Sequence, residues 1–164
     1  MSKGTLIVYS GPSGVGKGTL LLPYLQAQPE AALSVSMTTR SPRPGERDGV
    51  EYYFVSKQRF DEEIGQGGLL EYAQYSGNYY GTPRRMVEEK IAQGKDVFLE
   101  IEVQGAMKIK QTFPEAVFIF VMPPSWEVLK KRLTGRGTEP PEVVGRRLAA
   151  AQDEIHMAEK YDYI

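Results

Sequence analysis

A glycine-rich segment near the N-terminus could bind the phosphates of a nucleotide. It follows an apolar run at residues 5–9 and precedes a helix-compatible stretch, and its residues are Gly11, Pro12, Ser13, Gly14, Val15, Gly16, Lys17, Gly18 and Thr19. Glycines let backbone N–H groups turn inward around an anion, and a helix beginning there adds its positive end. Lys17 would place a charge beside the β- and γ-phosphates. These features favour a phosphate loop over a glycine-rich turn with a solvated lysine.

The residue after Lys17 departs from the usual phosphate-loop pattern, which has Ser or Thr there to hold Mg²⁺. Gly18 occupies this position, and Thr19 follows one residue later. We expect Thr19 to supply the hydroxyl on the metal side. The sequence leaves open whether it would reach the ion directly or through water.

Two arginines in residues 38–46 are candidates for binding a second phosphate. Arg40 and Arg43 share this segment with Pro42 and Pro44, which restrict the backbone. A guanidinium group can bind phosphate through paired hydrogen bonds. The alternative is a pair of solvated loop arginines, and the phosphate loop in the same chain favours binding.

A later arginine-rich segment could form a lid. Arg132 and Arg136 flank Gly135, and Arg147 follows after two prolines. Such a segment between two helices could bring positive charge onto a transferring phosphoryl group and exclude water. The alternative is an ordinary helical connection with exposed bases.

Two acidic residues lie at the end of the third predicted strand. Glu100 and Glu102 end the strand expected at residues 97–101, and alternation would place them on one face. The carboxyl edge of an open α/β sheet is where ligands bind. One carboxylate could hold Mg²⁺ through water, and the other could accept from a substrate donor. Acids that merely end a strand are the alternative.

Four further candidates lie between residues 51 and 82. Tyr52 and Tyr80 could hold phosphate, Thr82 adds a hydroxyl, and Glu71 could accept the paired N–H donors of a purine. Tyrosines alone more often pack than bind. The single histidine, His156, has no evident catalytic partner, so we expect a surface or packing position.

The elements that must position these residues indicate an α/β fold. Short apolar runs predict strands at residues 5–10, 33–36, 97–101 and 117–122. Helix-compatible segments lie between and after them, at residues 17–26, 83–93, 106–112, 126–134 and 142–160. Thr82 and Ser125 are predicted N-caps. This alternation predicts a parallel sheet flanked by helices.

Residues 51–80 interrupt the alternation. Strand-like residues 51–55 and 70–75 surround a short helical segment, and residues 76–78 predict a turn. We expect a small β-rich insertion that could close over a substrate. The final residues, 161–164, resemble the approach to another strand.

The composition narrows the class of protein. A chain of 164 residues with 41% hydrophobic content suits one domain with a real core, and its net charge of −1 does not favour nucleic acid. The lack of cysteine excludes disulfides and thiolate zinc sites. We see no membrane span or signal peptide and expect a cytoplasmic protein. The oligomeric state is left open.

Together the motifs resemble the guanylate kinase family. The resemblance covers nearly the whole chain, through residues 11–19, 34–43, 77–82 and 133–138 in order. It implies a P-loop nucleotide-kinase core at residues 1–36 and 83–134, a GMP-binding insertion at 37–82 and a helical lid at 135–147. The implied reaction transfers the γ-phosphoryl group of ATP to GMP, and to dGMP, with Mg²⁺.

The resemblance also implies roles for single residues. Residues 11–19, Arg132 and Arg136 would bind ATP, and Thr19 and Glu100 would face the metal. The GMP phosphate would be held by Ser36, Arg40, Arg43, Tyr52 and Tyr80. Guanine would be recognised by Glu71, Thr82 and Glu102. The charges acting in the transition state would be Lys17, Arg43, Arg136 and Arg147.

Three features depart from the family's usual pattern. Glu100 and Glu102 stand where many members have Asp, and Gly18-Thr19 is similar to adenylate kinase. The family usually continues into a further strand and a final helix, which are absent from this sequence.

Two alternatives follow from these comparisons of motifs. A guanylate-kinase-like scaffold domain would bind phosphorylated peptides and catalyse no reaction. Such a domain would be expected to have lost the loop lysine or the lid arginines, whereas this chain retains Lys17, Arg136 and Arg147. A kinase for AMP is mildly favoured by the residues after Lys17, and Glu71 argues against it.

Overall fold

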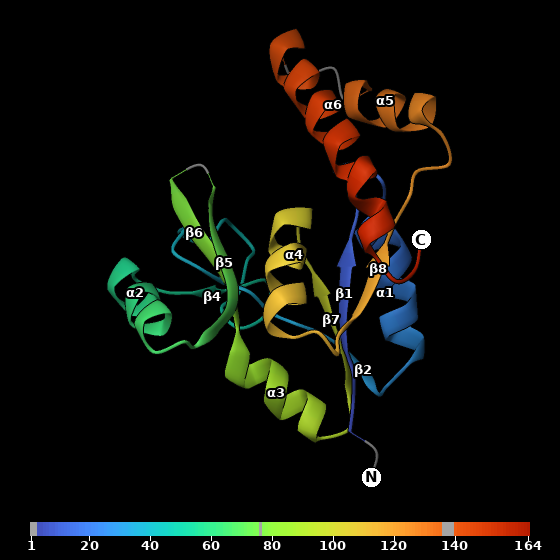
Figure 1. Cartoon of the computed structure of the whole chain (residues 1–164). Coiled ribbons are helices and arrows are strands. Elements are labelled where there is room, and N and C mark those ends of the chain that lie inside the picture. The colour runs from blue at the N-terminus through green and yellow to red at the C-terminus, as the bar shows by residue number, and fades with distance from the viewer. Residues whose placement is uncertain (1–2, 76, 136–139) are drawn as a thin grey trace.

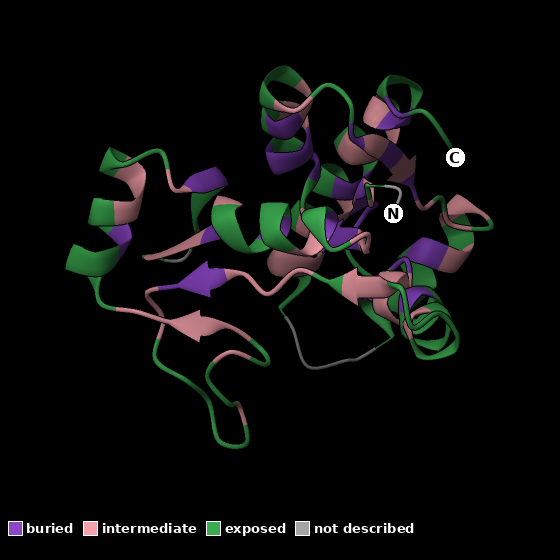
Figure 2. Ribbon diagram, turned by 90° about the horizontal axis from the view of Figure 1, so that it is seen from below, coloured by how far each residue is buried: buried purple, intermediate pink, exposed green. Residues whose placement is uncertain are grey.

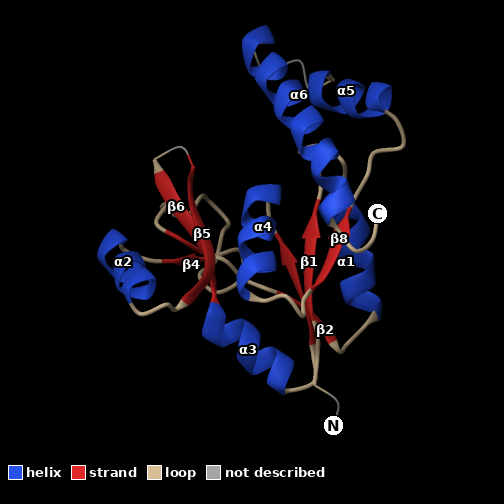
Figure 3. Cartoon of the chain, in the orientation of Figure 1, coloured by secondary structure: helices blue, strands red, loops and turns tan. Residues whose placement is uncertain are grey.

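The computed structural model describes residues 3–75, 77–135 and 140–164. These residues form two β-sheets surrounded by helices (Figures 1 and 3). The larger sheet is parallel and four-stranded, in the order β2-β7-β1-β8, with bounds Ala31–Leu33, Asp96–Glu100, Leu6–Ser10 and Val117–Phe120. The predicted α/β architecture with a parallel sheet is confirmed.

Helices cover both faces of this core sheet. Val97, Phe98 and Leu99 are consecutive in β7 and all buried, as expected for a strand with no solvent-facing side. Val97 and Leu99 pack toward α3 (Arg84–Ala92) and α4 (Val103–Thr112), whereas Phe98 packs toward α1 (Lys17–Ala27). Buried residues gather on the strands and on the inner faces of the helices (Figure 2).

The smaller sheet lies beside α4, away from the core sheet (Figure 1). Its order is β4-β3-β6-β5, with bounds Tyr53–Phe54, Met37–Thr38, Asn78–Pro83 and Leu69–Tyr75. The β3–β4 pair is parallel and the other pairs are antiparallel. Helix α2 (Lys57–Gly65) packs on it through the fully buried Phe60. The strand-like segments and short helix expected within residues 51–80 are therefore present.

Helices α5 (Trp126–Thr134) and α6 (Pro141–His156) stand at the carboxyl ends of the core strands (Figure 1). Ser125 caps α5 as predicted, because its Oγ accepts from the Val128 N–H at 3.2 Å. Leu129 and Leu133 pack with Val15, which fixes α5 against the glycine-rich loop. After the 3₁₀ turn η1 (Met157–Lys160), Tyr163 forms a parallel bridge with Ile119 of β8.

Several predicted bounds were wrong. The strand expected at residues 33–36 is β2, which ends at Leu33 because the chain then crosses to the smaller sheet at Met37. The helix expected at residues 106–112 begins at Val103, and Gly105 lies inside it rather than before it. The helix expected at residues 142–160 ends at His156, followed by η1. Ser76, in the predicted turn, lies outside the described residues.

The predicted N-cap at Thr82 was also wrong. Helix α3 begins at Arg84, and its N-cap is Pro83, which makes no side-chain cap hydrogen bond. Strand β6 continues to Pro83, so Thr82 stays in the sheet and is fully buried. Its hydroxyl donates to Glu71 Oε1 at 2.8 Å instead.

Candidate active site

The glycine-rich loop joins β1 to α1, as the sequence predicts for a phosphate loop. Gly14 and Gly16 have φ angles of 79° and 98°, which side chains rarely adopt. A Cβ on Gly14 would also lie 2.9 Å from Leu133 Cδ2, so α5 leaves no room there. Lys17 curls back over the loop, and its Nζ donates to the Gly11 carbonyl at 2.8 Å. The backbone shape therefore depends on glycine at two positions.

Two arginines from the helices above the strands contact this loop. Arg132 Nη1 donates to the Val15 carbonyl at 2.9 Å, and Arg147 Nη2 donates to Ser13 Oγ at 3.0 Å. A cavity of about 690 Å³ opens beside them, lined by Ser13, Gly14, Val15, Gly16, Thr19, Leu20, Val121, Met122, Pro124, Arg132, Leu133 and Arg147. The loop, Thr19, Arg132 and Arg147 therefore meet around one space. Arg136 lies outside the described residues.

A second cavity of about 410 Å³ lies between the two sheets. Its lining includes most of the residues predicted for the second substrate, together with Lys17 and Glu100; the full set is Lys17, Ser36, Tyr52, Glu71, Ala73, Tyr80, Gly81, Glu100, Ile101, Glu102, Gln104 and Gly105. Lys17 reaches this cavity, whereas Gly16 and Thr19 line the first one. The loop thus separates two spaces, and its lysine faces the smaller.

Glu71 is the most buried acid of the second cavity. Burial raises the pKa of its carboxyl group, the Thr82 hydroxyl and the charge of Lys108 lower that pKa, and the Glu102 charge raises it. The balance leaves the pKa above the ordinary value for glutamate. A Cβ on Gly105 would lie 3.1 Å from Glu71 Oε2, so glycine in α4 makes space for this carboxylate. Glu71 is therefore held between β6 and α4.

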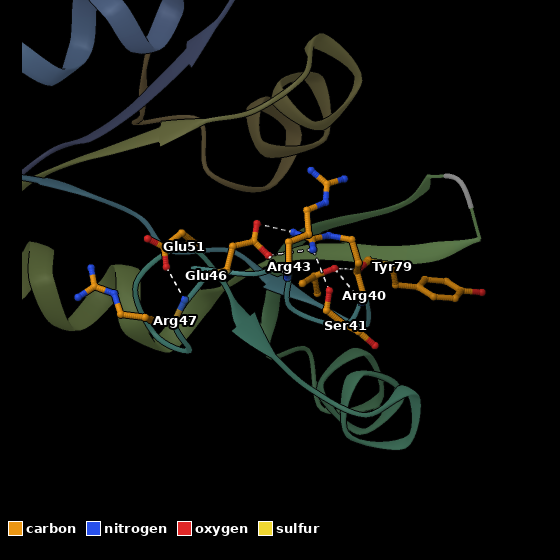
Figure 4. A network of polar contacts seen from close by, with 8 residues as sticks. Arg40, Ser41, Arg43, Glu46, Arg47, Glu51 and Tyr79 are labelled. Atoms are coloured by element: carbon orange, nitrogen blue, oxygen red, sulfur yellow. Dashed lines mark hydrogen bonds and ion pairs between the residues drawn. The ribbon is translucent and has the colours of Figure 1, made fainter.

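Arg40 has a carboxylate partner that sequence reasoning missed. Its Nη1 and Nη2 each donate to Glu46 at 2.9 Å, and Glu46 also accepts from the Arg43 N–H at 2.7 Å (Figure 4). These hydrogen bonds raise the pKa of Arg40 and lower the pKa of Glu46. The guanidinium carbon lies 5.3 Å from the centre of the Tyr52 ring. This contact places Arg40 beside the tyrosines of the second cavity.

The residues predicted for the second substrate are thus brought together only in part. Arg40, Arg43 and Thr82 do not line the cavity between the sheets. Thr82 is linked to this cavity by its hydrogen bond to Glu71, and Arg40 is linked to it by its contact with the Tyr52 ring. The Tyr52 and Tyr80 rings contact each other edge to face, 5.9 Å apart.

Glu100 and Glu102 both line the smaller cavity, although β7 ends at Glu100 and does not extend to residue 101 as predicted. Glu100 is the last residue of β7, and Glu102 is the N-cap position of α4 without a side-chain cap hydrogen bond. Both carboxylates are exposed. In residues 3–75, 77–135 and 140–164, no group of three or more His, Asp or Glu side chains could hold a metal ion.

Comparison with known proteins decides the family. The family model for guanylate kinase matches residues 3–164. The chain is 60% identical over 161 residues to a guanylate kinase of Synechocystis sp., covering 98% of this chain and 84% of that protein. It is 55% identical over 162 residues to a guanylate kinase of Oceanobacillus iheyensis, with 99% and 79% covered.

This chain belongs to the guanylate kinase family.

The solved structures agree with this assignment. A crystal structure of guanylate kinase from Anaplasma phagocytophilum superposes with a TM-score of 0.73 at 36% identity, covering 99% of this chain and 76% of that chain. As a member of the guanylate kinase family, the chain is a nucleoside monophosphate kinase that phosphorylates GMP with ATP. Its described helices are all too short or too polar to cross a membrane.

Sequence reasoning missed several cavity residues of this guanylate kinase family member. In the smaller cavity they are Ala73, Gly81, Ile101, Gln104 and Gly105. Ala73 lies two residues after Glu71 on β5, so strand alternation could have placed it on the same face. In the larger cavity they are Leu20, Val121, Met122, Pro124 and Leu133, apolar residues whose pattern does not distinguish them from core residues.

Proposed function

We propose that the two cavities bind ATP and GMP, and that Lys17 acts where they meet. One observation carries the proposal: residues of the same phosphate loop line both spaces. Ser13 to Gly16 and Thr19 line the larger cavity, whereas Lys17 lines the smaller. A phosphoryl group moving from one nucleotide to the other would pass this lysine.

The larger cavity is proposed for ATP. The loop N–H groups and the N-terminus of α1 supply an anion site for the triphosphate. Arg132 and Arg147 already contact the loop backbone and Ser13, which puts positive charge at its rim. Arg136 is proposed to join them. Arg136 and Arg147 belong to the lid proposed for residues 135–147, and Arg132 lies just before it on α5.

The smaller cavity is proposed for GMP. Glu71 would accept from guanine N1–H and N2–H, with Thr82 holding the carboxylate and Glu102 nearby as a further acceptor. The GMP phosphate is assigned to the hydroxyls and guanidinium groups at the other end of the site: Ser36, Tyr52, Tyr80, Arg40 and Arg43. The Arg40 guanidinium group lies beside the Tyr52 ring, which supports the assignment of both residues to the same phosphate.

The proposed transfer is a direct displacement. A phosphate oxygen of GMP forms a bond to the γ-phosphorus of ATP, the bond from that phosphorus to the β,γ-bridging oxygen breaks, and ADP leaves with that oxygen. Charge on the moving group is neutralised by Lys17, Arg43, Arg136 and Arg147. Such charges would act strongly once closure of the site excludes water.

Mg²⁺ is the proposed cofactor, bound with ATP. It would neutralise phosphate charge and usually keeps several waters, needing only one or two protein oxygens. Thr19 lines the ATP cavity and Glu100 the GMP cavity, so a hydroxyl and a carboxylate of suitable chemistry flank the loop. These two residues are proposed to hold the ion.

The fold supports a division into a core, an insertion and a lid. We assign residues 1–36 and 83–134 to the core and about 37–82 to the GMP-binding insertion. The smaller sheet and α2 fall within this insertion except at Pro83. Closure of the insertion toward α4 would shrink the GMP cavity and exclude water.

A coupled ADP-release assay across GMP, dGMP, AMP and UMP tests the proposal. We expect turnover with GMP, also with dGMP, and little with AMP or UMP. Release of ADP with none of the four would contradict phosphoryl transfer, and equal use of AMP would contradict the assignment of the smaller cavity to guanine.

A further inference from the structure

A lysine on α4 joins the core to strand β5 of the smaller sheet. Lys108 Nζ donates to the Tyr72 carbonyl at 2.8 Å and lies 5.7 Å from the centre of the Tyr72 ring. The Tyr72 ring in turn packs edge to face on Phe60, with the ring centres 6.4 Å apart. Phe60 is fully buried in the apolar cluster of the smaller sheet. These contacts therefore connect the core helix with the packed interior of the insertion.

The part of β5 that Lys108 contacts is irregular. Strand β5 pairs with β6 at Leu69 and again at Tyr72, with a shift of register between them. Glu71 lies within this shift, and because such an irregularity disrupts the ladder, strand pairing alone does not fix the backbone there. Strand β5 is also the last strand of its sheet, with α4 beside it (Figure 1). The hydrogen bond from Lys108 thus holds the residue next to Glu71 from the side of α4.

The face of α4 that carries Lys108 also lies against the Glu71 carboxylate. Gly105 precedes Lys108 by three residues, so both lie on one side of the helix. Glu71 Oε2 would be 3.1 Å from a Cβ on Gly105. Burial raises the pKa of Glu71, whereas the Thr82 hydroxyl and the Lys108 charge lower it. Lys108 is exposed and does not line the smaller cavity, so its influence on a bound molecule would pass through β5.

We propose that Lys108 is a positioning residue for the recognition of guanine. By holding the Tyr72 peptide against α4, it fixes the irregular part of β5 and with it the direction in which Glu71 faces the cavity. A carboxylate that is in place before the nucleotide arrives loses less conformational freedom on binding. This inference rests on the proposed assignment of the smaller cavity to GMP and adds a residue that does not touch the nucleotide.

Two variants of Lys108 separate its donor group from its stem. Lys108→Met keeps an unbranched side chain and removes the ammonium, whereas Lys108→Arg keeps a charged donor. Lys110→Met is the matched control on the same helix. Lys110 Nζ also donates to a backbone carbonyl, that of Lys160, and lies 5.1 Å from the centre of the Phe118 ring, but both partners lie away from the smaller sheet. The measurements are calorimetric binding of GMP and of a non-hydrolysable ATP analogue, kcat and KM for GMP, and the melting temperature.

We expect Lys108→Met to weaken GMP binding and raise KM for GMP by about three- to tenfold, the scale of one hydrogen bond. Binding of the ATP analogue and kcat at saturating GMP should stay near the parent values, and Lys108→Arg should recover most of the lost GMP affinity. Lys110→Met should bind GMP like the parent chain. Unchanged GMP binding in Lys108→Met would overturn the inference. So would an equal loss in Lys108→Arg or in Lys110→Met, or a lowered melting temperature with equal losses for GMP and the ATP analogue.

A double-mutant cycle tests whether Lys108 acts through Glu71. If it directs the Glu71 carboxylate, Lys108→Met should weaken GMP binding less in a Glu71→Gln background than in the parent chain. Additive losses would overturn the inference, because Lys108 would then act elsewhere. A parent chain that binds GMP but releases no ADP would contradict the proposed phosphoryl transfer alone, since GMP binding still tests Lys108. A parent chain that binds no GMP would overturn both.

Discussion

The Thr82 hydroxyl donates a 2.8 Å hydrogen bond to Glu71 Oε1 across the antiparallel pair β5–β6. Thr82 is fully buried, and burial also raises the pKa of Glu71. A buried carboxylate needs its hydrogen-bond donors, because an unpaired charge away from water is costly. This pair therefore links the stability of the smaller sheet to the proposed reading of guanine.

Thr82→Val tests this link, since valine keeps the size and removes the hydroxyl. We expect a loss of about 1–3 kcal/mol in the free energy of unfolding, measured by urea titration, and a lower kcat/KM for GMP. Thr112→Val is the control, because Thr112 lines neither cavity and its hydroxyl donates at 3.3 Å to the Lys108 carbonyl of its own helix. Loss of GMP use in the control of the same size as in Thr82→Val would contradict a specific role for Thr82.

The raised pKa of Glu71 predicts a pH-dependent stability. A carboxyl whose folded-state pKa lies above its unfolded value binds protons better when folded, so this contribution is present at low pH and lost as pH rises through the folded pKa. Glu71→Gln should therefore raise the melting temperature at pH 7, by about 2–4 °C for each kcal/mol recovered at this chain length. The gain should shrink toward pH 4. A variant less stable than the parent at pH 7 would contradict this sign.

Lys17→Ala should impair turnover far more than folding. Lys17 is only half-buried and makes its hydrogen bonds to loop carbonyls, whereas charge placement carries most of phosphoryl transfer. We expect kcat to fall by about two to four orders of magnitude, with a nearly unchanged melting temperature. Lys130→Ala, on the exposed side of α5, serves as control. Near-normal turnover without Lys17 would remove it from the catalytic set.

Gly105→Ala should disturb GMP rather than ATP. The added Cβ would lie 3.1 Å from Glu71 Oε2 and 3.3 Å from Ile101 Cδ1, so the carboxylate must shift. We expect a raised KM for GMP with little change for ATP. Gly145→Ala places the same methyl in α6, where nothing lies within 4 Å, and should stabilise by about 0.5–1 kcal/mol. An unchanged KM for GMP in Gly105→Ala would show that this glycine does not set the position of Glu71.

Local sequence patterns predicted the strand, glycine-rich turn and helix around Gly14 and Gly16 well, because these features are determined within a few residues. Contacts between residues far apart in the sequence could not be predicted in this way. Thr82 looked like a helix cap, and its bond to Glu71 depends on the pairing of β5 with β6. The 3.0 Å hydrogen bond from Arg147 to Ser13 likewise requires α6 to fold back over the loop, which local patterns do not show. Mg²⁺ and the cytoplasmic location stay predictions.

The preference for GMP over AMP, compared between the parent chain and Glu71→Ala, tests the account most directly. Guanine offers N1–H and N2–H₂ as adjacent donors, whereas adenine has no donor at N1 and none at C2, so only guanine can pair with both oxygens of Glu71. We predict that the mutation lowers kcat/KM for GMP by about tenfold to a few hundredfold and barely changes residual AMP use. A GMP:AMP ratio of kcat/KM that is the same in both proteins would contradict the claim that Glu71 reads the base.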